Sequence, residues 1–158
     1  MRCSERLRAL SMNVAQTTAE FVALFSCGLF AGAAAYITFV EHPARIACGS
    51  EVAVTEFRPS YKRASVMQAS LAIIGFIATL VAWWPRRDIA WLVGGLLLVS
   101  VVPITLFAIF PTNRQLFDPG LDLRSAHTTL LLRRWGHLHA IRTLLSVMAF
   151  LILLCAVI

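Results

Sequence analysis

Four long apolar runs limit what this sequence can fold into. They cover residues 20–40, 64–84, 89–110 and 137–158, and most of the charged residues lie outside them or near their ends. A helix needs about 20 apolar residues to cross about 30 Å of hydrocarbon. Lipid offers no partner for unpaired backbone groups, and the runs do not alternate as barrel strands do. They therefore predict four transmembrane helices.

The composition agrees with a membrane location. The chain is 59% hydrophobic and 14% charged, whereas soluble domains contain about 25% charged residues. In a soluble protein the net charge of +6 would point to nucleic acid. Here the arginines flank apolar runs, where they suit lipid headgroups and helix orientation. We therefore expect an all-α integral membrane protein with membrane lipids, and no nucleic acid, as partners.

The runs and their connections predict the architecture. We expect residues 19–158 to form one up-down-up-down four-helix bundle, preceded by a loose polar extension over residues 1–18. The short segment PRRD, residues 85–88, should be the turn between the second and third spans. Gly28 and Gly32 form a GxxxG pattern, which predicts close packing against another helix.

The arginines also predict the orientation of the bundle. The two longer connections, residues 41–63 and 111–136, contain more Lys and Arg than the turn at residues 85–88. By the positive-inside rule, both longer connections should lie in the cytoplasm, with the spans in a bacterial inner membrane.

Polar side chains gather at one end of the predicted bundle. The helix ends on that side read VEHPAR (40–45), RPSYKRASVMQ (58–68), FPTNR (110–114) and RRWGHLHAIR (133–142). The opposite end contains a group of tryptophans, as an interfacial aromatic belt would. A simple anchoring pattern would place polar groups at both ends, so this asymmetry indicates a functional site.

Helical spacing separates the residues of the fourth span. At about 100° per residue, Trp135, His139 and Arg142 share one stripe, whereas His137 lies about 200° from His139. Arg142 lies deepest and should face the bundle or a wet cavity, although an arginine can also snorkel to the interface. We therefore expect His139 to face inward and His137 outward, so the two cannot hold one metal ion.

Prolines mark two other helix ends. Pro43 disfavours helix at the preceding residue, so we expect the chain to turn at His42. Pro111 and Asn113 should likewise stop the third helix. Glu41 and His42 could belong to a site or simply meet water at the end of the first span.

The second span carries a polar stripe. Tyr61, Ser65 and Gln68 share one helical face. Gln68 lies about one turn deep and should hydrogen-bond to another helix or to a ligand, because an unpaired amide in hydrocarbon is costly. We expect the polar residues of all four helix ends to converge in one cavity, formed by His42, Tyr61, Asn113 and His139.

Four motifs together resemble a known family. They are VEHPAR after the first span, SYKRASVMQASLA opening the second, PxTLxxIxPTNxxL closing the third and LLxxWxxLHAxRT opening the fourth. The combination is similar to the small four-helix membrane family that includes the fungal anthrone oxygenases, over roughly residues 19–158. The resemblance implies a monooxygenase that inserts oxygen from O₂ into an anthrone carbon without an evident nicotinamide or flavin site.

The resemblance also implies roles for the histidines. An anthrone is flat, apolar and phenolic, and its CH₂ group is acidic. His42 or His139 would be the general base that removes this proton, because imidazole titrates near neutrality. Glu41 would orient a histidine.

The other polar residues would bind the substrate. Arg142, Asn113 and Tyr61 would stabilise a phenolate or peroxide oxygen. Trp135 would stack on the flat ring system, and Gln68 would also contact the substrate.

Two alternatives remain at this point. No motif requires a cofactor, but iron or copper suits nitrogen and oxygen ligands, and the candidate ligands are Glu41, His42, Asn113 and His139. Haem between the two histidines is the weaker version of this idea. The second alternative is a non-catalytic accessory subunit, or a lipid- or quinone-binding subunit, of a membrane complex. A flat polar end would favour docking to a partner, whereas an enclosed pocket would favour an enzyme.

Overall fold

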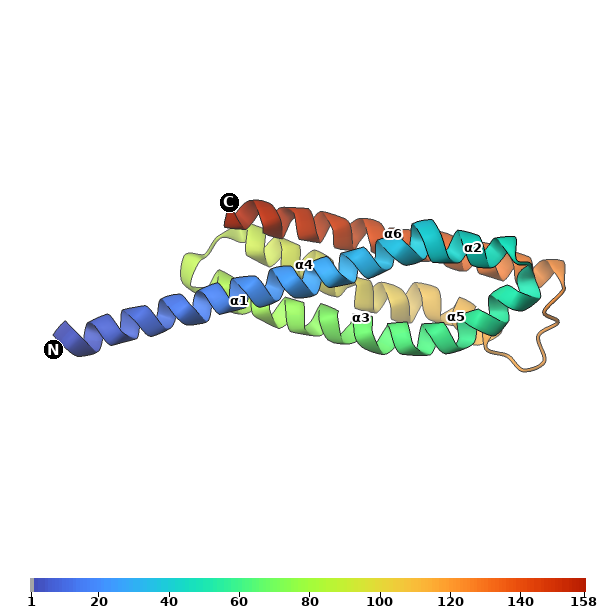
Figure 1. The fold of residues 1–158 in the computed structure, drawn as a ribbon, viewed down its shortest axis with the longest axis horizontal. Helices are drawn as coiled ribbons and strands as arrows, with labels where there is room; N and C mark the ends of the chain where they lie inside the picture. The colour runs from blue at the N-terminus through green and yellow to red at the C-terminus, as the bar shows by residue number, and fades with distance from the viewer. Residues whose placement is uncertain (1) are drawn as a thin grey trace.

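The chain forms four long helical rods (Figure 1). The computed structural model describes residues 2–158, with side chains from residue 12 onward. The first rod contains α1 (Arg2–Tyr36), η1 (Ile37–Glu41) and α2 (His42–Ala47), and the second is α3 (Ser50–Arg86). The third contains α4 (Ile89–Ile104), η2 (Thr105–Ile109) and α5 (Phe110–Leu116), and the fourth is α6 (Ala126–Val157). Residues 2–158 contain no strand, which confirms the all-α prediction.

Each rod is long and apolar enough to cross a membrane. The four candidate spans are Met12–Ala47, Ser50–Arg86, Ile89–Leu116 and Ala126–Val157. With a rise of 1.5 Å per residue, the 37 residues of α3 extend over about 55 Å, well beyond the hydrocarbon thickness. The prediction of a loop over residues 41–63 is wrong. Instead, α2 and the start of α3 continue the helices beyond the hydrocarbon.

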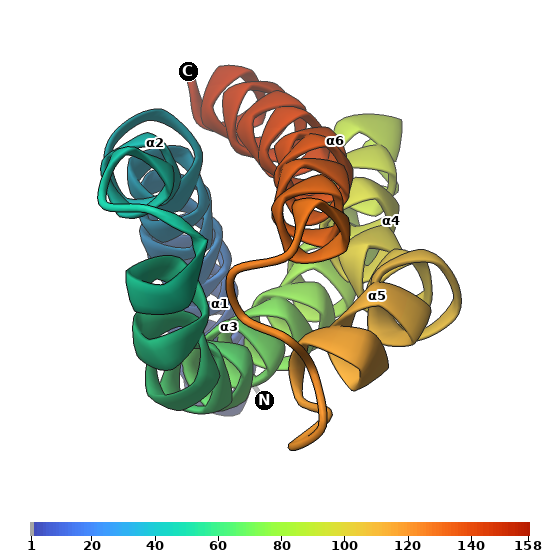
Figure 2. The same cartoon turned by 90° about the vertical axis from the view of Figure 1, so that its right-hand side faces the viewer.

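The rods pack as an up-down-up-down bundle. α1 contacts α3 and α6, and α4 contacts the same two helices, so the four rods enclose one central axis (Figure 2). The turn predicted at residues 85–88 is present. Arg87 has a left-handed backbone with φ of 55°, and the Asp88 side chain caps α4 by accepting a 2.9 Å hydrogen bond from the Ala90 amide.

Close helix contacts involve one glycine of the predicted pair and another glycine outside it. A Cβ atom on Gly95 would lie 2.1 Å from Thr79 Oγ1, so α4 approaches α3 too closely for a side chain there. Gly28 packs against the Phe150 ring, where an added Cβ would lie 3.0 Å away. The prediction is wrong for Gly32, which faces outward and would place a Cβ more than 4 Å from other groups.

Two helices continue through prolines that were expected to end them. The turn expected at His42 and the helix end expected at Pro111 are both wrong. Proline lacks an N–H group and crowds the carbonyl four residues earlier. A wider π-helical turn lies directly before each proline, and in the first of them the His42 amide bonds to the Ile37 carbonyl five residues back. This local widening accommodates Pro43 and Pro111 without breaking the rods.

The last connection is fastened to the start of α3. Ser50 Oγ donates a 2.6 Å hydrogen bond to the Leu123 carbonyl, and Arg58 Nε donates one of 3.0 Å to the Leu116 carbonyl. Arg124 forms an ion pair of 2.7 Å with Glu51. Residues 117–125 therefore lie against the polar end of the bundle.

A polar layer separates two apolar cores. From Leu131 onward along α6, the buried side chains are first apolar (Leu131, Leu132, Trp135), then polar (His139, Arg142, Thr143, Ser146), and then apolar again (Ala149, Leu153). Buried polar groups need partners, so this layer is the natural place to look for a site.

The N-terminal segment is helical. α1 begins at Arg2 and runs through residues 12–18 without a break, and its start extends past the other rods (Figure 1). The side chains of residues 1–11 lie outside the described residues, and the division at residue 18 stays a prediction.

Candidate functional site

The inward stripe of α6 supplies the central residues. Trp135, His139 and Arg142 are 3%, 1% and 6% exposed, whereas His137 is exposed. The prediction that His139 faces inward and His137 outward is therefore confirmed. It follows from helical periodicity, because the two histidines are only two residues apart and cannot share a face.

His139 is held from two sides. Its Nδ1 lies 3.0 Å from Thr38 Oγ1 on η1, and Thr38 Oγ1 lies 2.8 Å from Thr143 Oγ1. Thr143 lies one turn after His139, and its hydroxyl donates a 3.1 Å hydrogen bond to the Ala34 carbonyl. On its face, the His139 ring stacks on the Trp135 indole with centroids 4.8 Å apart. The ring is thereby fixed in position and orientation.

Arg142 is a buried cation without an anionic partner in the part of the chain whose side chains are described. It donates a 2.8 Å hydrogen bond to Gln68 Oε1 on α3, and its guanidinium lies 5.7 Å from the centroid of the Phe30 ring. Among the residues described, it forms no ion pair, and its Nε has no hydrogen-bond partner. Charged residues at membrane depth are normally paired or face a functional cavity, so an anionic group in an adjoining cavity would complete this site.

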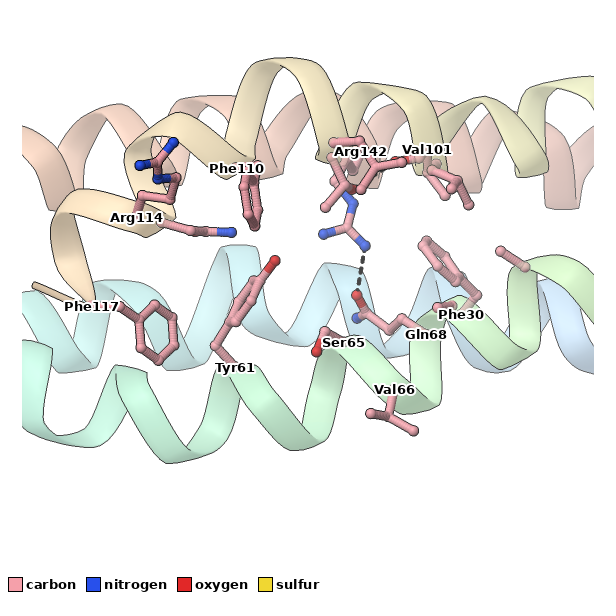
Figure 3. Close-up of a pocket in the computed structure, with 16 residues that line it drawn as sticks. Phe30, Tyr61, Ser65, Val66, Gln68, Val101, Phe110, Arg114, Phe117 and Arg142 are labelled. Atoms are coloured by element: carbon pink, nitrogen blue, oxygen red, sulfur yellow. Dashed lines mark hydrogen bonds between the residues drawn. The ribbon is translucent and has the colours of Figure 1, made fainter.

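Such a cavity lies between α3 and the rod formed by α4, η2 and α5. We name it the large cavity; its volume is about 570 Å³, within the range of small-molecule sites. Phe30 and Arg142 reach it from α1 and α6. Figure 3 shows Tyr61 and Arg142 pointing into the same space. Other residues that line it are Ser65, Val66, Gln68, Leu106, Phe110 and Asn113.

The mouth of the large cavity is apolar. Val66, Leu106 and Phe110 line it and are 70%, 57% and 50% exposed. In a membrane-spanning bundle these side chains face lipid. A ligand could therefore enter sideways from the bilayer and reach the polar groups at the inner wall.

Several polar atoms near the large cavity lack partners. Asn113 is 2% exposed, and neither of its amide atoms has a hydrogen bond within the described chain. Gln68 Nε2 is unpartnered in the same way. Leaving such a group buried and unpaired costs about 1–3 kcal/mol. A polar ligand, or a water beside it, would satisfy these atoms.

A second, small cavity adjoins the first. Its volume of about 20 Å³ is enough for roughly one water molecule. Trp135 and His139 line it on one side, and Tyr61, Gln68 and Arg142 line both cavities. His139 therefore lines the small cavity and not the large one, whereas Arg142 lines both.

The predicted convergence of four residues is only partly realised. Asn113 lines the large cavity, His139 lines the small one, and Tyr61 lines both. His42 lines neither, because its ring occupies the space beside Gly136, where an added Cβ would lie 2.5 Å from His42 Nε2. The prediction that all four residues share one cavity is therefore wrong.

Glu41 has a different partner from the one expected. It pairs with Arg45, which also pairs with Glu56 on α3 and lies over the Phe57 ring at 5.6 Å. Arg45 is 6% exposed, so this network fixes the end of the first rod to α3. Glu41 lines the small cavity but its carboxylate is engaged by Arg45 rather than by a histidine.

Trp135 also differs from its expected place. Its indole packs against His139 and, edge to face, against Phe57 with centroids 5.1 Å apart. It lines the small cavity but not the large one. A ring in the large cavity would therefore meet Phe30, Tyr61 or Phe110 before Trp135.

The candidate metal ligands are not assembled. Over the described residues, no group of three or more His, Cys, Asp or Glu side chains lies close enough to hold a metal ion. Glu41 is paired with Arg45, and Nδ1 of His139 contacts Thr38. Asn113 lies across the bundle in the large cavity.

Sequence reasoning missed two polar residues of the site. Thr143 could have been found, because it lies four residues after His139 and faces the same side of α6. Thr38 had a weaker signal, a single hydroxyl in the last part of an apolar run. The π-helical turn that contains Thr38 is not visible in the sequence.

Fold and site together define a class: a four-helix membrane protein with a lipid-facing cavity whose inner wall carries a cation without an ion-pair partner among the described residues. The family model described as anthrone oxygenase matches residues 57–152, more than half of the 158-residue chain. The chain belongs to the anthrone oxygenase family, which confirms the resemblance seen in its motifs. No curated protein and no solved structure matches it. The matched segment contains every residue that lines the large cavity except Phe30.

Proposed function

We propose that this protein oxidises a flat, apolar, phenolic substrate with O₂ at the large cavity. The observation that carries the proposal is Arg142, a buried guanidinium without a carboxylate partner in the described chain, on the inner wall of an apolar cavity. A substrate that binds as a phenolate or enolate supplies the missing negative charge. Membership in the anthrone oxygenase family supports oxygenase chemistry in general terms.

The reaction needs a base and a stabilised anion. Removal of one proton from the CH₂ group between two aromatic rings gives a carbanion. Its charge spreads through the rings onto the ketone oxygen, which becomes an enolate oxygen. Arg142 holds that oxygen, assisted by the Tyr61 hydroxyl, and such donors act more strongly in a site that excludes water. His139 is the base, acting through one water in the small cavity.

The carbanion then reacts with O₂. One electron passes from carbon to O₂, a C–O bond forms, and a proton gives the hydroperoxide. Loss of water from the hydroperoxide leaves a carbonyl at the former CH₂ carbon. The substrate loses two hydrogens and gains one oxygen, and the second oxygen atom leaves as water, so no other reductant is required.

The membrane supplies both reactants in this proposal. Apolar aromatic molecules and O₂ dissolve in lipid, and the mouth at Val66, Leu106 and Phe110 opens toward lipid. The polar end of the bundle faces the cytoplasm of a bacterial inner membrane, because it carries more arginines than the turn at Arg86 and Arg87. Cysteine labelling at residues 120 and 87, with labels that cannot cross the membrane, tests this orientation.

The test is oxygen uptake by the purified protein in lipid nanodiscs with an anthrone. Arg142→Gln should lower kcat about 10²–10³-fold, the range for loss of one anion-stabilising donor. Arg133→Gln is the matched control, since Arg133 is exposed on the same helix. Binding of a quinone or lipid to the cavity without oxygen uptake by the wild type would indicate the non-catalytic binding subunit instead.

A further inference from the structure

Two threonines form a hydrogen-bond relay from His139 to a backbone carbonyl. His139 Nδ1 lies 3.0 Å from Thr38 Oγ1, which lies 2.8 Å from Thr143 Oγ1. Thr143 Oγ1 lies 3.1 Å from the Ala34 carbonyl and 3.3 Å from the carbonyl of His139 itself. The chain crosses from α6 to η1 and back, and it ends on groups that can only accept.

The carbonyl end fixes the direction of every bond. Each threonine hydroxyl has one hydrogen to donate. If Thr143 donates to either carbonyl, its oxygen accepts the Thr38 hydrogen, and Thr38 must then accept from His139. This requires a proton on Nδ1 and satisfies three contacts. The reverse direction, in which Thr38 donates to His139, leaves Thr143 without a hydrogen for a carbonyl and satisfies only two.

A neutral imidazole carries one proton, so the two nitrogens take opposite roles. With the proton on Nδ1, Nε2 has the free lone pair. His139 lines the small cavity, and within the described chain its Nε2 has no hydrogen-bond partner. The lone pair is therefore available to a molecule in that cavity.

We propose that Thr38 and Thr143 are positioning residues that hold the proton of His139 on Nδ1 and leave Nε2 as the acceptor at the small cavity. The use of Nε2 as a base rests on the proposed function, whereas the position of the proton does not. The relay defines one ligand chemistry for the small cavity: a molecule, such as water, that donates a hydrogen bond to Nε2.

The test reads the proton directly, without substrate. Full-length protein labelled with ¹⁵N-histidine is placed in nanodiscs at alkaline pH, where an ordinary imidazole is neutral. Nitrogen NMR distinguishes protonated from unprotonated ring nitrogens, and the His139 signals are assigned by their loss in His139→Gln. The other three histidines serve as internal references.

Wild type should show one bound proton, on His139 Nδ1. Thr38→Val removes the acceptor, so the proton should move to Nε2, and Thr143→Val should populate both forms. Thr38→Ser keeps a hydroxyl and should restore the wild-type pattern. Ser146→Ala is the matched control, because Ser146 is a buried hydroxyl on α6 that bonds within its own helix.

Two results would overturn the inference. One is a wild-type protein with the proton on Nε2, which contradicts the relay directly and without any variant. The other is a folded Thr38→Val protein in which Nδ1 alone still carries the proton. Oxygen uptake plays no part in either result, so a failure of the proposed reaction would be recognised separately.

Discussion

Arg142 and Arg45 are equally buried but differ in their partners, and this difference predicts opposite effects when each side chain is replaced. Both are 6% exposed. Arg45 pairs with Glu41 and Glu56, whereas Arg142 has Gln68 and the Phe30 ring. If Arg142 is present for a ligand, the ligand-free protein should be more stable without it.

The magnitude for Arg142 follows from its contacts. Burying an ion costs several kcal/mol even after relaxation. The hydrogen bond to Gln68 returns about 1.5–3 kcal/mol, and the contact with Phe30 about 0.5–2 kcal/mol. Arg142→Met alone would leave Gln68 Oε1 unpaired, so the double variant Arg142→Met, Gln68→Leu is the cleaner change. We expect it to stabilise the protein by about 1–4 kcal/mol, as when buried charges are replaced by packed apolar groups.

Arg45→Met should act in the opposite direction. It leaves Glu41 and Glu56 without their cation and removes the ion pair between the first rod and α3. Breaking a buried pair costs about 3–5 kcal/mol, and we expect the low end because Glu56 is 46% exposed.

The assay for both changes is thermal unfolding in one detergent without ligand. For a chain of this length, 1 kcal/mol moves the midpoint by about 2–4 °C. The Arg142 double variant should unfold at a higher temperature and lose activity, and the Arg45 variant should unfold at a lower one. A double variant that unfolds well below wild type would show that Arg142 stabilises the fold, and the argument for an anionic ligand would fail.

The remaining predictions concern packing and access. Gly95→Ala should destabilise the bundle by about 1–3 kcal/mol, because its Cβ would lie 2.1 Å from Thr79 Oγ1; Gly32→Ala, with open space around it, should be neutral or stabilising in the same unfolding assay. Leu106→Trp should narrow the mouth of the large cavity and raise KM for oxygen uptake. Phe107→Trp, on the neighbouring 81% exposed residue that does not line the cavity, should leave KM unchanged, and equal KM values in the two variants would exclude this entry route.

Periodicity and hydropathy predicted most of the fold and one part of the site. Four apolar runs are enough to place four spans, and a spacing of two residues is enough to separate His139 from His137. Local rules failed at Pro43 and Pro111, because a π-helical turn before each proline depends on the packed bundle rather than on the residues beside it. Sequence motifs alone therefore could not show where the rods continue.

The partners of polar residues could not be predicted for a related reason. Glu41 and His42 are adjacent in sequence, but the first faces Arg45 and the second packs beside Gly136. Which neighbour a side chain meets depends on the rotation of each rod about its axis. The large cavity also depends on how far α3 and α5 stand apart, and no spacing within one helix records that distance.

The most direct test of the proposed function is oxygen uptake with an anthrone by three proteins: wild type, His139→Ala and His137→Ala. Both histidines lie on α6, but one lines the small cavity and the other is exposed. Wild type should consume O₂ and form the anthraquinone, and His139→Ala should be slower by about 100-fold or more, as expected for loss of a general base. His137→Ala should retain wild-type turnover. Full activity in His139→Ala, or equal losses in both variants, would contradict the role of His139 as the base.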